Sequence, residues 1–290
     1  MITPPPLRPG DRVAVIAPSS PFDVERYRAG AAWLAERYEL AVRDDLLARE
    51  GYLAGNDARR RAELEAALDD DRVRAIVAAR GGFGATRVVH LVDWSLLARR
   101  PKWIVGFSDV TALHVEAAAV GVRSIHAPMV AFLGGAAAAR EPFRACLEGE
   151  PTPPWEQLEV VVAGEARGPA FGGNLALLAA CAASRRLRVP EGALVFLEDC
   201  TERPYRLDRM LTSLRVGGFF ERAAGVVVGG LTDCEPGADG VTAEQVVREH
   251  LHALGLPARM GAPFGHGADN RPFVLGAQAR LDPRGGVRFD

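Results

Sequence analysis

The first half of the chain alternates two hydrophobic patterns. Short apolar runs, typical of buried strands, are separated by segments in which apolar residues recur at helical spacing. This alternation predicts a parallel sheet with helices on both faces, and ligands of such sheets bind at the carboxyl ends of the strands. The apolar runs lie at residues 12–17, 40–42, 73–79, 103–105 and 122–125, and the helical segments at 23–38, 56–68, 86–91 and 109–119.

The pattern breaks at a proline-rich stretch that contains Pro151, Pro153 and Pro154. Prolines in this density cannot continue a helix or a central strand. We therefore expect an α/β domain over residues 1–147, a linker over 148–165 and a smaller α/β domain over 166–290. The second domain should have antiparallel or barrel-like character. Its helical segments lie at 174–183, 205–214 and 243–254, and its strand-like runs at 193–197, 226–228, 273–275 and 277–281.

The composition of the 290 residues is that of an ordinary globular protein, with a net charge of −2 and a single lysine, Lys102. No basic block is present, which argues against nucleic acid as a partner. We see no secretory signal and no apolar run of membrane-spanning length. The four cysteines are far apart in the sequence, which favours reduced thiols in a cytoplasmic protein.

Ser108 occupies a predicted turn from a strand to a helix, in the stretch Gly106-Phe-Ser-Asp109. Such a turn exposes a side chain above the sheet and directs the following backbone N–H groups at an approaching ligand. This is the setting that a serine nucleophile needs. The stretch is not Gly-x-Ser-x-Gly, because Val110 stands at the fifth position. The alternative is that Ser108 or Asp109 only caps the helix.

A second turn, Arg80-Gly-Gly-Phe-Gly84, also follows a predicted strand. It lacks the spacing of a dinucleotide-binding loop, and no P-loop lysine follows it. Glycines let the backbone approach a reacting carbonyl closely. If this turn lies beside Ser108, its N–H groups could complete an oxyanion hole. A tight turn without a chemical role is the alternative.

Candidate partners for a serine nucleophile occur in the second half. Glu198 and Asp199 end a predicted strand and should point to opposite faces, so that one could orient a histidine. The other would be a helix cap or an ion-pair partner. His266 lies between glycines after a strand-like run, and the order Ser, Glu, His is one that catalytic triads adopt. No His or Cys spacing matches a zinc site, so we expect no catalytic metal.

Two further residues have alternative interpretations. Trp155, in the expected linker, is either an anchor against the core or an aromatic platform for a ligand base. Cys200 follows the two carboxylates and is either a packed thiol or a second nucleophile.

Taken together, these stretches resemble the LD-carboxypeptidases, or murein tetrapeptide carboxypeptidases, a family that includes the microcin C self-immunity hydrolases. They occur in the family's order over most of the chain. The matching stretches are residues 79–84, 106–114, 172–175, 196–199, 203–209 and 263–267.

The resemblance implies a serine peptidase that uses neither a metal nor an organic cofactor. Ser108 would be the nucleophile, His266 the general base and Glu198 the group that orients it. The fold would be a flavodoxin-like or Rossmann-like N-terminal α/β domain followed by the smaller domain that carries Glu and His. The family also tends to form dimers, which implies a homodimer.

The oxyanion hole would combine the N–H of Asp109 with that of Gly81 or Gly82. The implied reaction, part of peptidoglycan recycling, shortens a murein tetrapeptide to a tripeptide by removing a terminal D-amino acid. Arg80 or Arg203 could bind the terminal carboxylate, although either could equally be a structural ion-pair residue.

Two other functions stay open. One is hydrolysis of an aminoacyl- or peptidyl-nucleotide, for which a tryptophan that stacks on adenine would be the signature. The other is a non-catalytic, two-domain ligand-binding protein. Phe83 stands where the family often has tyrosine, so the sequence does not define the substrate preference.

Overall fold

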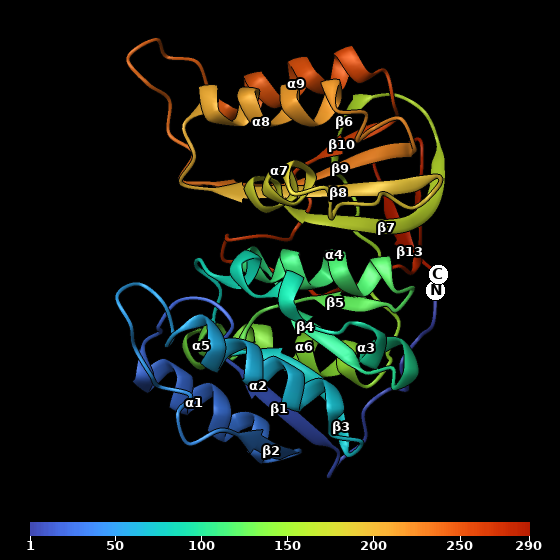
Figure 1. Ribbon diagram of the computed structural model, residues 1–290. Coiled ribbons are helices and arrows are strands. Elements are labelled where there is room, and N and C mark those ends of the chain that lie inside the picture. The colour runs from blue at the N-terminus through green and yellow to red at the C-terminus, as the bar shows by residue number, and fades with distance from the viewer. The chain divides into compact units, whose positions relative to one another are not determined.

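Two β-sheets organise the chain, which a computed structural model describes over residues 1–290 (Figure 1). The first unit comprises Met1–Glu150 and Arg271–Val274, and the second comprises Pro151–Asn270 and Leu275–Asp290. None of the helices combines the length and the apolar character needed to span a membrane.

The first unit contains a six-stranded sheet in the order β11-β5-β4-β3-β1-β2. Strands β1 to β5 pair in parallel, which confirms the sheet predicted from the alternating pattern. Helices α1 to α6 flank it (Figure 1). The strands are β1 (Arg12–Ile16), β2 (Glu39–Val42), β3 (Val73–Ala78), β4 (Trp103–Gly106), β5 (Ser124–His126) and β11 (Phe273–Leu275), and the helices are α1 (Val24–Ala35), α2 (Asp57–Asp69), α3 (Ser95–Arg99), α4 (Thr111–Ala119), α5 (Val130–Gly135) and α6 (Arg140–Leu147).

One predicted helix of this unit is wrong. Residues 86–91 form two short 3-10 turns, η1 (Ala85–Arg87) and η2 (Val89–Leu91), rather than an α-helix. A segment this short gains few hydrogen bonds for the residues it orders, so the α-helix does not propagate.

The side chain of Lys102 caps the C-terminal end of α2. Its Nζ atom donates to the backbone carbonyls of Ala67, Leu68 and Asp70 at distances of 3.1, 2.8 and 2.8 Å. These carbonyls lie at the C-terminal end of the helix, where backbone carbonyls lack N–H donors from the helix itself. The side chain is only 2% exposed, and burial lowers the pKa of its ammonium to about 8.

The second unit contains a seven-stranded mixed sheet in the order β13-β12-β7-β8-β9-β10-β6. Strands β7 to β10 are parallel, whereas β6, β12 and β13 pair antiparallel at the edges, in agreement with the expected antiparallel character. The strands are β6 (Glu159–Val162), β7 (Ala166–Asn174), β8 (Ala193–Cys200), β9 (Ala223–Thr232), β10 (Ala258–Met260), β12 (Gln278–Leu281) and β13 (Val287–Phe289), and the helices are α7 (Leu175–Ala183), α8 (Pro204–Val216) and α9 (Ala243–Leu254).

Trp155 anchors the start of the second unit. Its side chain is 1% exposed, and its ring packs against Phe264 and Phe289 with centroid separations of 5.7 and 4.9 Å. Its backbone exchanges two hydrogen bonds with Val287. The interpretation of Trp155 as a core anchor is therefore confirmed, and the ring is not available as an exposed platform.

Candidate active site

Ser108 lies in a strained turn between β4 and α4. It has φ = 63°, in the left-handed region that a residue with a Cβ atom rarely adopts. The turn is tight, because a Cβ atom on Gly106 would lie 2.8 Å from a methyl carbon of Val110. A half-buried serine at such a junction has the local geometry of a nucleophile turn, even though valine replaces the final glycine of the usual motif.

The turn at residues 80–84, called the glycine turn below, lies directly against Ser108. A Cβ atom on Gly81 would lie 3.0 Å from the Ser108 Cβ and 3.1 Å from its Oγ, so a larger residue would displace the hydroxyl. The same position is 3.4 Å from the backbone nitrogen of Asp109. Ser20 supports the turn from the other side, because its backbone N–H donates to the Gly81 carbonyl at 3.2 Å. The Cβ of any larger residue at Gly82 would meet the Ser20 hydroxyl at 2.5 Å.

The Asp109 side chain is fully buried and does not cap the helix that follows it. Its Oδ2 atom accepts hydrogen bonds from the Ser19 hydroxyl at 2.6 Å and from the Ala85 N–H at 2.8 Å. The first turn of α4 has no side-chain cap, so the helix-cap alternative is wrong for this stretch. Burial raises the pKa of the Asp109 carboxyl, while its hydrogen-bond donors act in the opposite direction.

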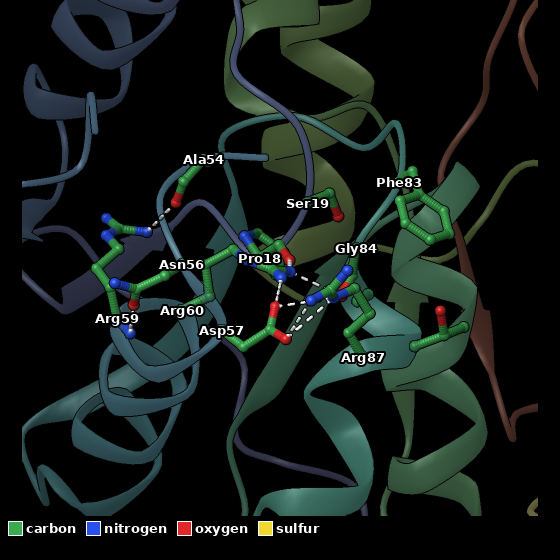
Figure 2. A network of polar contacts seen from close by, with 12 residues as sticks. Pro18, Ser19, Ala54, Asn56, Asp57, Arg59, Arg60, Phe83, Gly84 and Arg87 are labelled. Carbon is green, nitrogen blue, oxygen red and sulfur yellow. Dashed lines mark hydrogen bonds and ion pairs between the residues drawn. The ribbon is translucent and has the colours of Figure 1, made fainter. Parts of the chain in front are cut away.

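Arg60 on α2 lies beneath the same turns (Figure 2). Its fully buried guanidinium donates to the carbonyls of Pro18 and Gly84 at 2.6 and 2.7 Å. It also pairs with Asp57, which in turn binds Arg87 through both carboxylate oxygens. Figure 2 shows Arg60 between the two carbonyls and the Asp57 carboxylate. The turns after β1 and β3 are therefore attached to one buried side chain.

The second unit brings Glu198 and His266 together. Glu198 is fully buried on β8, and its Oε2 lies 2.7 Å from Nδ1 of His266 in the loop after β10. Gly265 makes this approach possible, because a Cβ atom there would lie 2.9 Å from the same carboxylate oxygen. Burial favours the neutral imidazole, but hydrogen bonds with Cys200 and Glu198 outweigh it and raise the pKa of His266.

Asp199 follows Glu198 on β8, but its carboxylate has different partners. Its carboxylate accepts from the Ala176 N–H at 3.0 Å and from Asn174 Nδ2 at 3.1 Å. It therefore caps α7, one of the two roles that the sequence left open. Burial and the neighbouring Glu198 raise the pKa of this carboxyl to about 7.

Arg80 and Arg203 are both exposed. Arg80 donates to the Pro21 carbonyl at 2.7 Å, and Arg203 donates to the carbonyls of Glu235 and Pro236 at 3.3 and 3.0 Å. These are backbone contacts in loops, and each arginine keeps further donors for a carboxylate ligand.

Sequence reasoning missed Ser19 and Arg60. Ser19 had a signal, because Pro18-Ser-Ser-Pro21 is one of the turns at the carboxyl ends of the strands. Arg60 had none, since it lies in an arginine-rich helix and only the fold distinguishes it from its neighbours. No group of three or more His, Cys, Asp or Glu side chains is arranged to hold a metal ion.

Family models match both halves of the chain. Residues 13–127 match the LD-carboxypeptidase N-terminal domain, and residues 167–281 match the LD-carboxypeptidase C-terminal domain. The chain belongs to the LD-carboxypeptidase family. Both Ser108 and the glycine turn lie within the first matched range, and Glu198 and His266 lie within the second.

Known members of the LD-carboxypeptidase family are similar over nearly the whole chain. A Bacillus subtilis protein named "Probable murein peptide carboxypeptidase" is 34% identical over 95% of this chain and 90% of its own. The crystal structure of muramoyltetrapeptide carboxypeptidase from Oxalobacter formigenes is 27% identical, with a TM-score of 0.84 and coverage of 96% and 97%. The microcin C7 self-immunity protein MccF, solved with aspartyl sulfamoyl adenosine, shares the fold, with a TM-score of 0.87, 20% identity and coverage of 100% and 99%.

Proposed function

We propose that this protein is a serine-type LD-carboxypeptidase. It hydrolyses the amide between an L-centre and a terminal D-amino acid, and it converts murein tetrapeptide to tripeptide in peptidoglycan recycling. The observation that carries the proposal is the left-handed Ser108, held at a strand-to-helix junction with Gly81 against its hydroxyl, in a member of this family.

In the proposed reaction, His266 accepts the proton of the Ser108 hydroxyl as the oxygen attacks the scissile carbonyl. Glu198 binds Nδ1–H and so leaves Nε2 as the basic nitrogen. The imidazolium then protonates the leaving D-alanine, and water releases the acyl-enzyme. This mechanism requires Nε2 to come within hydrogen-bond reach of the hydroxyl during the reaction.

The developing oxyanion is bound by the N–H of Asp109 and by an N–H of the glycine turn, at Gly81 or Gly82. One such donor typically lowers the barrier by about 3–4 kcal/mol. The D-alanine carboxylate binds a guanidinium, for which Arg80 and Arg203 are the candidates, because arginine binds carboxylates through two parallel hydrogen bonds.

The test is incubation with purified murein tetrapeptide, followed by mass spectrometry for tripeptide and free D-alanine. We expect Ser108→Ala to lower turnover by about 10⁴-fold or more. Ser213→Ala is the matched control, because that hydroxyl only donates to the Arg209 carbonyl on α8. Absence of tripeptide with folded wild-type protein would rule out the proposed substrate.

Two other functions are tested alongside it. Release of nucleotide from an aminoacyl- or peptidyl-nucleotide conjugate, faster than release of D-alanine, would favour the nucleotide-conjugate hydrolase. Trp155 does not support that function, because its ring is buried in the core. Labelling of Ser108 by a fluorophosphonate would exclude a non-catalytic binding protein. Failure to label, with ligand binding unchanged in Ser108→Ala, would favour one.

A further inference from the structure

Three turns meet at the carboxyl edge of the first sheet, and the Asp109 carboxylate joins them. Asp109 belongs to the turn after β4. It accepts from Ser19 in the turn after β1 and from Ala85 at the end of the glycine turn after β3. One buried side chain, directly after Ser108 in the sequence, therefore has a contact in each of the other two turns.

Arg60 joins two of the same turns from the side of α2. It donates to the carbonyl of Pro18, the residue before Ser19, and to the carbonyl of Gly84, the residue before Ala85 (Figure 2). Both ionisable groups are 0% exposed, so burial shifts the pKa of each against its charged form, and each charge partly offsets that shift for the other. Burying charges is costly unless they are well paired, so this arrangement restricts how the turns can move.

The backbone at Ser108 needs such support. A left-handed serine persists only where its surroundings fix the conformation. The N–H that would bind the oxyanion belongs to Asp109 itself, so a shift of the carboxylate also shifts this donor. A shift of Ala85 or Gly84 likewise moves the glycine turn that touches Ser108.

We infer that Asp109 and Arg60 are positioning residues that fix the oxyanion donors and Ser108 in their positions relative to one another. This inference rests on the proposed function, and it assigns the two side chains no contact with substrate. Asp109 acts through its own backbone N–H and through Ser19 and Ala85. Arg60 acts through the carbonyls of Pro18 and Gly84.

The test compares Asp109→Ala, Asp109→Asn, Ser19→Ala and Arg60→Met. We expect Asp109→Ala and Arg60→Met to lower kcat about 10²-fold with KM changed less than threefold, since small displacements of reacting groups have effects of this size. Asp109→Asn should recover most of the loss, because an amide oxygen at the position of Oδ2 can accept from both Ser19 and Ala85. Ser19→Ala should lower kcat about tenfold. Because it removes a single hydroxyl group, this variant should affect folding least of the four.

Arg259→Met is the matched control. Arg259 is also fully buried and also donates to backbone carbonyls, those of Val162, Gly164, Ala258 and Asp282, but it belongs to the second unit. The Arg259→Met variant should lower the melting temperature as Arg60→Met does. Its folded protein should nevertheless keep kcat within threefold of the wild-type value. Equal losses of kcat in both arginine variants would overturn the assignment of Arg60.

Two readouts separate this inference from the proposed function. One is kcat and KM for D-alanine release, and the other is the second-order rate of Ser108 labelling by a fluorophosphonate, both per folded molecule. If wild type is labelled but releases no D-alanine, the proposed substrate is wrong. The labelling rates of the variants then still test the inference that Asp109 and Arg60 position Ser108. Labelling of Ser19→Ala and Asp109→Ala at the wild-type rate would overturn it. Wild type that is neither labelled nor active would overturn both.

Discussion

Nδ1 of His266 lies 2.7 Å from Oε2 of Glu198, although 68 residues separate the two in the sequence. Because the carboxylate is fully buried, its position is fixed by β8, and the imidazole is oriented with Nε2 directed away from it. A histidine held in this way has a defined tautomer and a strengthened basicity.

The first prediction concerns the pH dependence of catalysis. The pKa of His266 is raised, and only the neutral imidazole can accept a proton, so kcat/KM of wild type should increase as pH rises from neutral to alkaline. Glu198→Gln removes the charge that stabilises the imidazolium. The increase should then occur at lower pH, and the maximal rate should fall by about 10²- to 10⁴-fold. An unchanged pH profile in this variant would show that Glu198 does not tune the histidine.

The second prediction concerns backbone strain at Ser108. Left-handed backbone costs a residue with a Cβ atom about 1–2 kcal/mol, whereas glycine adopts it freely. Ser108→Gly should therefore have a free energy of unfolding about 1 kcal/mol higher than Ser108→Ala, while both lack activity. Chemical denaturation of the two variants measures this difference. Equal stabilities would mean that the turn is not strained.

The third prediction concerns Gly81. A methyl group there would lie about 3 Å from the Ser108 Cβ and Oγ, so Gly81→Ala should displace the hydroxyl and lower kcat about 10²-fold. Gly135→Ala is a suitable control, because its Cβ would meet nothing closer than 3.6 Å. Steady-state kinetics with tetrapeptide measures both variants. Wild-type kcat in Gly81→Ala would exclude the glycine turn from the site.

The fourth prediction concerns Cys200. It is half-buried, whereas Cys146, Cys181 and Cys234 are buried, and it is a hydrogen-bond partner of His266. Iodoacetamide should therefore modify Cys200 before the other thiols, and the added group should abolish D-alanine release. Peptide mapping locates the modification. Cys200→Ser should keep its activity within a few fold of the wild-type value and resist inactivation by iodoacetamide. If iodoacetamide inactivates this variant as well, the sensitive group is not Cys200.

Local patterns predicted much of the fold and part of the candidate site. The apolar runs of β1 to β5 and the alternation that separates Glu198 from Asp199 depend on neighbouring residues alone. Strand β7 was missed because Gly168, Pro169, Gly172 and Gly173 make it read as a loop. Strand β6, whose burial pattern is that of an edge strand, lies inside the stretch 148–165 that the prolines predicted as a linker.

The partners of buried polar groups could not be predicted in the same way. Asp109 reads as a helix cap from its neighbours, and its contact with Ser19 joins positions 90 residues apart. Nothing in the stretch Ala58-Arg-Arg-Arg61 distinguishes Arg60 from the two arginines beside it. Only the packing of α2 against the sheet decides which guanidinium faces the interior.

The buried position of Lys102 also has a practical consequence. It is the only lysine of the chain, and its Nζ atom is occupied by three carbonyls at the end of α2. Amine-reactive dyes and aldehyde crosslinkers should therefore not react with the Lys102 side chain in the folded protein and should couple to the α-amino group instead. A single-site conjugate for surface immobilisation then follows without any engineered tag.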